Sequence, residues 1–67
     1  MIKKQEFINA LSTLLFSWGG DTPPEAVWAA NEMLEWYEKE YGVKLNIEIE
    51  EDGSTDFEDV KRAILAN

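Results

Sequence analysis

The chain has 67 residues, of which 14 are acidic and 6 basic, so its formal charge is −8 at pH 7. It contains neither cysteine nor histidine, which excludes disulfides, the usual zinc, haem and iron–sulfur ligand sets, and nucleophiles paired with histidine. The negative charge also argues against binding nucleic acid or an anionic membrane, because phosphate groups are recognised by Lys and Arg. We therefore expect one domain, residues 1–67, with a marginal core and no cofactor.

The first predicted element is an amphipathic helix over residues 3–18. We expect Gly19-Gly20 to end it, since paired glycines readily adopt the left-handed conformations that close a helix. Its apolar positions recur at helical spacing and predict one buried stripe: Phe7, Leu11, Leu14, Leu15 and Trp18.

A second helix is predicted from about residue 23 to residue 41. Thr22 and Glu25 form a capping box around Pro23, which suits the first helical position because no N–H is needed there. Gly42 is the expected stop. The predicted apolar stripe of this helix consists of Ala26, Ala30, Met33, Leu34, Tyr37 and Tyr41.

Residues 43–50 alternate between apolar and polar side chains, which predicts a strand with one buried face. After a turn at 51–54, Thr55 and Glu58 form another capping box and predict a last helix over residues 56–65. Phe57, Val60 and Ile64 would be its apolar stripe. The order helix-helix-strand-helix predicts a small domain of the α+β class.

A single strand cannot satisfy its own backbone donors and acceptors. Either residues 55–58 fold back as a short second strand, or residues 43–50 pair with another chain, where antiparallel pairing about a two-fold axis would give a homodimer. We favour pairing with another chain, because the capping box indicates a helix after the turn and a lone two-stranded ribbon is weakly stable.

Two aromatic residues, Phe16 and Trp28, fall outside the apolar stripes of their helices. In an antiparallel hairpin both would lie at the end that holds the connecting loop, where they could form one aromatic patch ringed by carboxylates, as in protein-binding hot spots. The alternative is that the third helix or a second subunit covers them, because large aromatic rings usually belong to cores and interfaces of the fold itself. Trp36 is expected at the margin of the core.

The acidic tract between residues 48 and 59 invites a calcium-loop interpretation, but the match is poor. Glu occupies the first position, Thr55 takes the apolar place, and the preceding segment is strand-like. We therefore predict no metal site. The aligned residues are Glu48, Glu50, Asp52, Ser54, Asp56 and Asp59.

The same carboxylates support a binding function. Glu48 and Glu50, joined to Glu32 and Glu35 of the second helix, could imitate the phosphates of nucleic acid and occupy the basic groove of a nucleic-acid-binding protein. The alternative is that these charges serve solubility. We do not expect an enzyme, because so small a core can hardly enclose a substrate cleft.

The sequence thus predicts a cytoplasmic, acidic protein-binding module whose partner is basic. Regulation or inhibition of a nucleic-acid-binding protein is the sharper form of this hypothesis. The candidate contact residues are Phe16, Trp28, Glu32, Glu35, Glu48 and Glu50. The competing hypothesis is a structural protein that assembles with itself and uses its strand edge and aromatic rings in its own interface. No apolar run approaches the ~20 residues of a membrane span.

Overall fold

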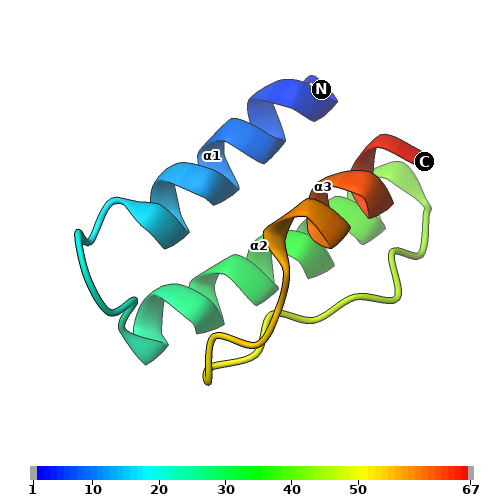
Figure 1. Cartoon of the computed structure of the whole chain (residues 1–67). Coiled ribbons are helices and arrows are strands. Elements are labelled where there is room, and N and C mark those ends of the chain that lie inside the picture. The colour runs from blue at the N-terminus through cyan, green and yellow to red at the C-terminus, as the bar shows by residue number, and fades with distance from the viewer. Residues whose placement is uncertain (1, 67) are drawn as a thin grey trace.

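A computed structural model describes residues 2–66 and contains three helices (Figure 1). They are α1 (Lys4–Phe16), α2 (Pro24–Tyr41) and α3 (Phe57–Ala66). Helix α1 packs against both α2, to which it is antiparallel, and α3. Residues 2–66 contain no strand, so the predicted α+β class is wrong and this part of the chain is all-α. None of the helices it contains has the length and apolar character to cross a bilayer.

Helix α1 ends at Phe16 with Ser17 as its C-cap, before the predicted stop at Gly19-Gly20, and side chains close its end. The last carbonyls of a helix have no partner within it. The Trp18 indole donates to the backbone oxygen of Leu14 at 2.7 Å, and the Thr22 hydroxyl donates to that of Leu15 at 2.8 Å. Trp18 therefore lies outside the core and is 52% exposed, contrary to its predicted place in the buried stripe.

Helix α2 begins without the predicted capping box. Pro23 takes the N-cap position, where its ring has no acceptor for a cap bond, and Pro24 is the first helical residue in place of the predicted Pro23. The Thr22 hydroxyl is turned towards α1. At the other end, Gly42 adopts the left-handed conformation with φ 63°, and its N–H donates to the backbone oxygen of Glu38. The predicted stop at Gly42 is confirmed.

The left-handed conformation at Gly42 leads us to expect that a side chain at this position lowers stability. Gly42→Ala should lower the free energy of unfolding by about 1 kcal/mol, because a side chain disfavours this conformation. An added Cβ would meet no atom within 4 Å, so strain in the backbone is the whole effect. Gly20→Ala is the matched control, since its added Cβ is equally free of neighbours and no positive φ occurs there. Urea denaturation that shows equal loss in both variants would contradict the prediction.

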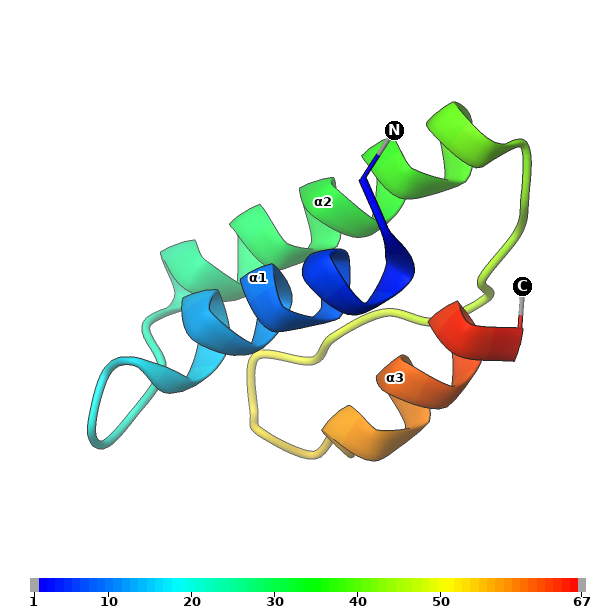
Figure 2. The same ribbon diagram turned by 90° about the horizontal axis from the view of Figure 1, so that it is seen from above.

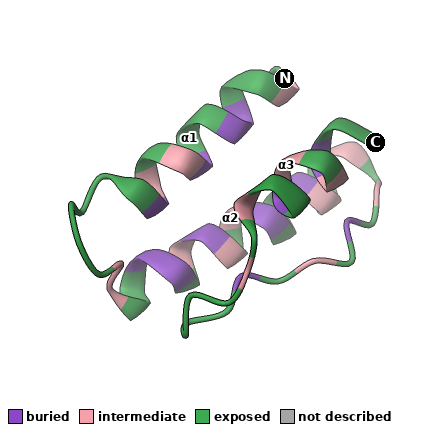
Figure 3. Ribbon diagram, viewed as in Figure 1, coloured by how far each residue is buried: buried purple, intermediate pink, exposed green. Residues whose placement is uncertain are grey.

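The core lies where the three helices converge (Figure 3). Most of the predicted stripe residues are buried, and Ile8 of α1 and Val27 of α2 join them although neither stripe included them. The buried apolar residues are Phe7, Ile8, Leu11, Leu15, Ala26, Val27, Ala30, Leu34, Tyr37, Leu45, Ile49, Val60 and Ile64.

Aromatic rings join α1 to α2 within this core. The Phe7 ring centroid lies 4.6 Å from that of Tyr37 and 6.1 Å from that of Trp36, while Tyr37 and Tyr41 stack at 4.4 Å. Burial raises the pKa of the Tyr37 hydroxyl above its ordinary value of 10.0, and neighbouring Tyr41 adds to the shift. The stability that depends on neutral Tyr37 is therefore complete below about pH 10 and is lost as the pH rises through the raised pKa.

Residues 43–50 remain extended, with the alternate burial that the sequence predicts but without a partner strand. Leu45 and Ile49 are buried, and Val43 and Ile47 are half-buried. The segment runs between α2 and α3 (Figure 2). Asn46 interrupts it with a left-handed φ of 54°, a conformation that Asn tolerates better than most residues. The interrupted backbone presents no regular ladder of donors and acceptors.

Side chains of α2 satisfy three backbone groups of this segment. Asn31 of α2 donates to the carbonyl of Ile49 and accepts from its N–H, both at 2.9 Å, as a neighbouring strand would. Glu38 accepts from the N–H of Leu45 at 2.7 Å. The reason for expecting pairing with another chain through residues 43–50, and hence a homodimer built on that strand, is therefore removed.

The alternative of a short second strand at residues 55–58 is also absent, because α3 begins at residue 57. The cap is Asp56, whose carboxylate accepts from the N–H of Glu58 at 3.0 Å. Thr55, the predicted cap, instead accepts from the N–H of Glu50 at 2.7 Å and ties the turn to the extended segment. The helix was predicted correctly, but its cap is Asp56 and not the predicted Thr55.

Candidate protein-binding surface

The charges of the molecule are segregated along its length. Lysine and arginine are absent from residues 5–38 and 45–60. The basic residues lie at the start of α1, around the end of α2 and on α3: Lys3, Lys4, Lys39, Lys44, Lys61 and Arg62. The opposite end, formed by the loop 17–23, the start of α2 and the turn 51–56 (Figure 1), carries carboxylates without basic neighbours. We call it the acidic end.

Distance keeps the two ends electrically distinct. The 18 residues of α2 span about 27 Å, whereas exposed charges are screened over roughly 8 to 10 Å at physiological ionic strength. Lys61 and Arg62 are also occupied within α3, where they pair with Glu58 at 3.6 Å and Asp59 at 3.0 Å. A partner that approaches the acidic end therefore meets a negative field.

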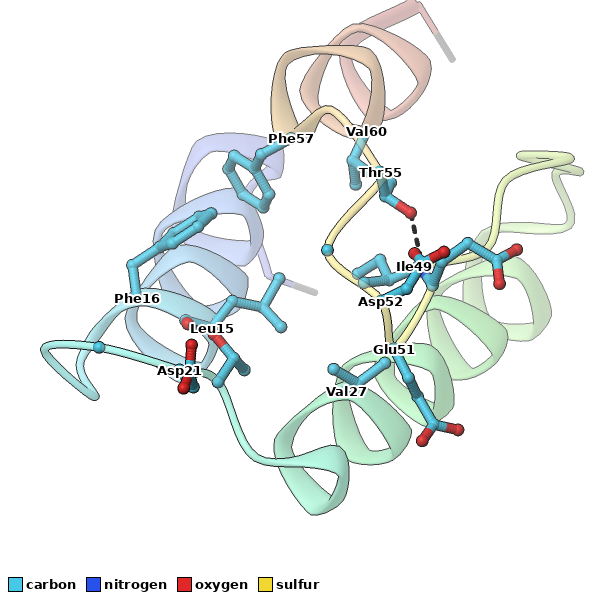
Figure 4. Close-up of a pocket in the computed structure, with 14 residues that line it drawn as sticks. Leu15, Phe16, Asp21, Val27, Ile49, Glu51, Asp52, Thr55, Phe57 and Val60 are labelled. Carbon is cyan, nitrogen blue, oxygen red and sulfur yellow. Dashed lines mark hydrogen bonds between the residues drawn. The ribbon is translucent and has the colours of Figure 1, made fainter.

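A groove of about 410 Å³ opens at the acidic end (Figure 4). We call it the end groove. Its floor consists of four buried apolar side chains from different segments: Leu15 of α1, Val27 of α2, Ile49 of the extended segment and Val60 of α3. Exposed carboxylates form its rim: Asp21, Glu50, Glu51 and Asp52. No lysine or arginine lines it.

Two phenylalanines form one wall of the end groove. Phe16 at the end of α1 and Phe57 at the start of α3 meet edge to face, with ring centroids 5.2 Å apart and planes at 89° (Figure 4). Phe57 is half-buried, whereas Phe16 is 61% exposed. The third helix thus contacts Phe16 without covering it, and the exposed ring lines the groove.

Trp28 lies outside the end groove and does not form the predicted single patch with Phe16. Its indole N–H donates to a carboxylate oxygen of Glu51 at 2.9 Å, and its side chain is 53% exposed. Glu51 belongs to the groove rim, so the bond links Trp28 to the turn that forms one wall. The two rings therefore lie at the same end with different partners, Phe57 for one and Glu51 for the other.

The turn 51–54 holds a carboxylate in a fixed position. Asp52 accepts a hydrogen bond from the backbone N–H of Ser54 at 2.9 Å. Hydrogen bonds from the Ser54 side chain and backbone lower the pKa of Asp52 below its ordinary value. The carboxylate is consequently ionised throughout the neutral range and keeps the groove rim negative.

The remaining candidate residues lie along α2 and the extended segment. Glu35 and Glu48 face a hollow of about 390 Å³ between these two elements, together with Glu38. Trp28 lines an adjacent hollow of about 290 Å³ with Glu48 and Glu50. Glu32 is exposed on α2 and lines none of the three hollows described. The structure thus brings together all the candidates except Glu32, in three neighbouring depressions.

Several residues that shape this surface had not been identified from the sequence. Asn31 holds the extended segment against α2, and Phe57 and Asp21 line the end groove. The absence of basic residues from 5–38 and 45–60 was visible in the sequence and could have located the acidic end. The partners of Asn31 are 18 positions away in the chain, and no local pattern indicates them.

The carboxylates of the calcium-loop alignment serve other contacts. Asp52 accepts from Ser54 and Asp56 caps α3. Within residues 2–66, no three acidic side chains come together in a group that could hold a metal ion.

Comparisons with protein-family models, with curated proteins and with solved structures found no match to this chain.

Proposed function

We propose that this chain is a small acidic protein-binding module that acts on a basic partner protein. The observation that carries the proposal is charge segregation: the exposed aromatic side chains of Phe16 and Trp28 lie among carboxylates, in stretches of the chain that contain no lysine or arginine. Rings within a charged rim are typical of binding hot spots.

The acidic end combines the two contributions that such a partner needs. Its negative field accelerates encounter with a positive surface, which raises the association rate more than the affinity. Its exposed rings supply apolar area that can be buried once the two proteins are in contact. A partner that normally binds phosphates has the complementary surface, so the sharper form of the proposal is regulation or inhibition of a nucleic-acid-binding protein.

The test is affinity capture with mass spectrometry at low salt, followed by elution with a DNA duplex. We expect captured proteins with basic nucleic-acid-binding surfaces, displaced by DNA and lost at ~0.5 M salt, where the Debye length is about 4 Å. Replacing Glu48 and Glu50 by Gln should reduce capture several-fold. The matched control replaces Glu6 and Glu40, which line none of the three hollows described, by Gln and should capture normally.

Capture that is unaffected by salt and by DNA would contradict the electrostatic mechanism. Sedimentation addresses the competing hypothesis of self-assembly. A monomer at micromolar concentration supports a module that binds other proteins, whereas a stable oligomer in which Phe16 and Trp28 are protected would favour a structural role.

A further inference from the structure

The end groove differs from the rest of the acidic surface because its floor is apolar. Leu15, Val27 and Ile49 are at most 8% exposed, and Val60 is fully buried. Figure 4 shows these side chains converging from α1, α2, the extended segment and α3. If the carboxylates served solubility alone, no apolar hollow would be needed between them. The volume of about 410 Å³ falls within the range of sites that enclose ligand groups.

The wall of the groove favours an aromatic occupant. The edge-to-face contact with Phe57 leaves Phe16 61% exposed. A further ring that entered the groove could pack on the exposed Phe16 ring and cover the floor at Leu15 and Val27. Burial of an aromatic side chain also contributes the large apolar area on which interface hot spots depend.

The rim of the groove determines what must accompany that ring. Asp21 stands on one side, and Glu51 and Asp52 stand on the turn opposite (Figure 4). No basic side chain of this chain lines the groove to neutralise them. An acidic or neutral segment would bury or approach these charges without compensation, whereas flanking Lys or Arg would pair with them. A second copy of this chain, at −8, would approach against net repulsion.

We infer that the end groove binds a basic segment of the partner protein, inserting one aromatic side chain against Phe16 and the apolar floor while neighbouring Lys or Arg residues meet Asp21, Glu51 and Asp52. This inference rests on the proposed function and adds to it a defined anchor. Steering by charge then brings the partner to the acidic end, and the aromatic anchor provides the slow dissociation that charge alone does not.

The experiment is an NMR titration of the intact chain at low salt with an end-blocked peptide in which Phe-Phe is flanked on each side by Lys-Arg. We expect methyl shifts at Leu15, Val27, Ile49 and Val60. A second peptide with Gly-Gly in place of Phe-Phe carries the same charge and should bind about tenfold more weakly, as loss of an anchor predicts. A third peptide with Gln in place of Lys and Arg should also bind at least tenfold more weakly.

Matched variants of the protein separate the anchor from the charge. Phe16→Ala should weaken the Phe-Phe peptide about tenfold and leave the Gly-Gly peptide unchanged. Leu65→Ala is the control, because Leu65 is 50% exposed near the end of α3, outside the groove. The double variant Asp21→Asn with Asp52→Asn should weaken both peptides, and its asparagine at 52 can still accept the bond from Ser54.

Equal affinity for the Phe-Phe and Gly-Gly peptides would overturn the inference, as would shifts confined to the outer face of α2 around Glu32. Binding of the uncharged peptide with undiminished affinity would overturn it too. None of these results would contradict the proposed function. That proposal is contradicted separately if partner capture is unaffected by salt, by DNA and by the Glu48 and Glu50 substitutions.

Discussion

Phe7→Ala should leave most of the protein unfolded at 25 °C. Phe7 is 1% exposed and lies between α1 and α2, with its ring against Tyr37 and Trp36. Truncation of a buried phenylalanine to alanine costs about 3 to 5 kcal/mol. A single core in a chain of this size supplies little more than about 3 to 5 kcal/mol of net stability. The loss therefore matches the whole stability of the domain.

The measurement is far-ultraviolet circular dichroism with thermal unfolding, supported by the dispersion of amide resonances. Phe16→Ala is the matched control, since it makes the same change on the same helix at a side chain that is 61% exposed. It removes one edge-to-face pair and should cost less than about 1.5 kcal/mol. A cooperative transition in Phe7→Ala within a few degrees of the unsubstituted protein would show that the core is organised differently.

Asn31→Ala should destabilise the fold by about 2 kcal/mol and release the extended segment. The substitution removes both hydrogen bonds to the backbone of Ile49, a residue that is only 8% exposed. Each buried polar group left without a partner costs about 1 to 3 kcal/mol, and partial access of water to this site places the total towards the lower end. The amide of Ile49 should lose its protection from hydrogen exchange.

Asn9→Ala provides the reference for this substitution. Asn9 is exposed on α1, and its side chain accepts from the Gln5 side chain at 3.0 Å. Its replacement should change stability by less than about 0.5 kcal/mol. Loss of the same size in both variants, or unchanged exchange at Ile49, would show that Asn31 does not hold the segment. Because this segment carries Glu48, Glu50 and one wall of the end groove, Asn31→Ala should also weaken partner binding.

The helices were predictable because their determinants are local. Apolar residues at helical spacing locate α1 and α2 to within about two residues, and Gly42 closes α2 as predicted. The prediction that Thr22 caps α2 was wrong, and no local sequence pattern indicates why. The hydroxyl can reach either the first amides of α2 or the last carbonyls of α1, and the turn places Leu15 within its reach.

The extended segment shows why alternation alone does not predict a strand. The alternation of apolar and polar residues indicates which side chains are buried, and Leu45 and Ile49 are indeed buried. It does not indicate which groups hydrogen-bond to the backbone, and here Asn31 and Glu38 do so. The predicted burial of Trp18 was wrong for a related reason. Trp18 is in register with the apolar stripe, but α1 ends at Phe16, before Trp18 is reached.

By itself, the sequence determined three helices, most of their buried faces, the −8 charge and the positions of Phe16 and Trp28 outside the stripes. Tertiary structure decided the class of the fold, the partners of residues 43–50 and the end groove. The physical reason is range: helical periodicity is fixed by neighbours within one or two turns. A polar group that must be satisfied, or a hollow that four segments share, depends on residues brought together from distant parts of the chain.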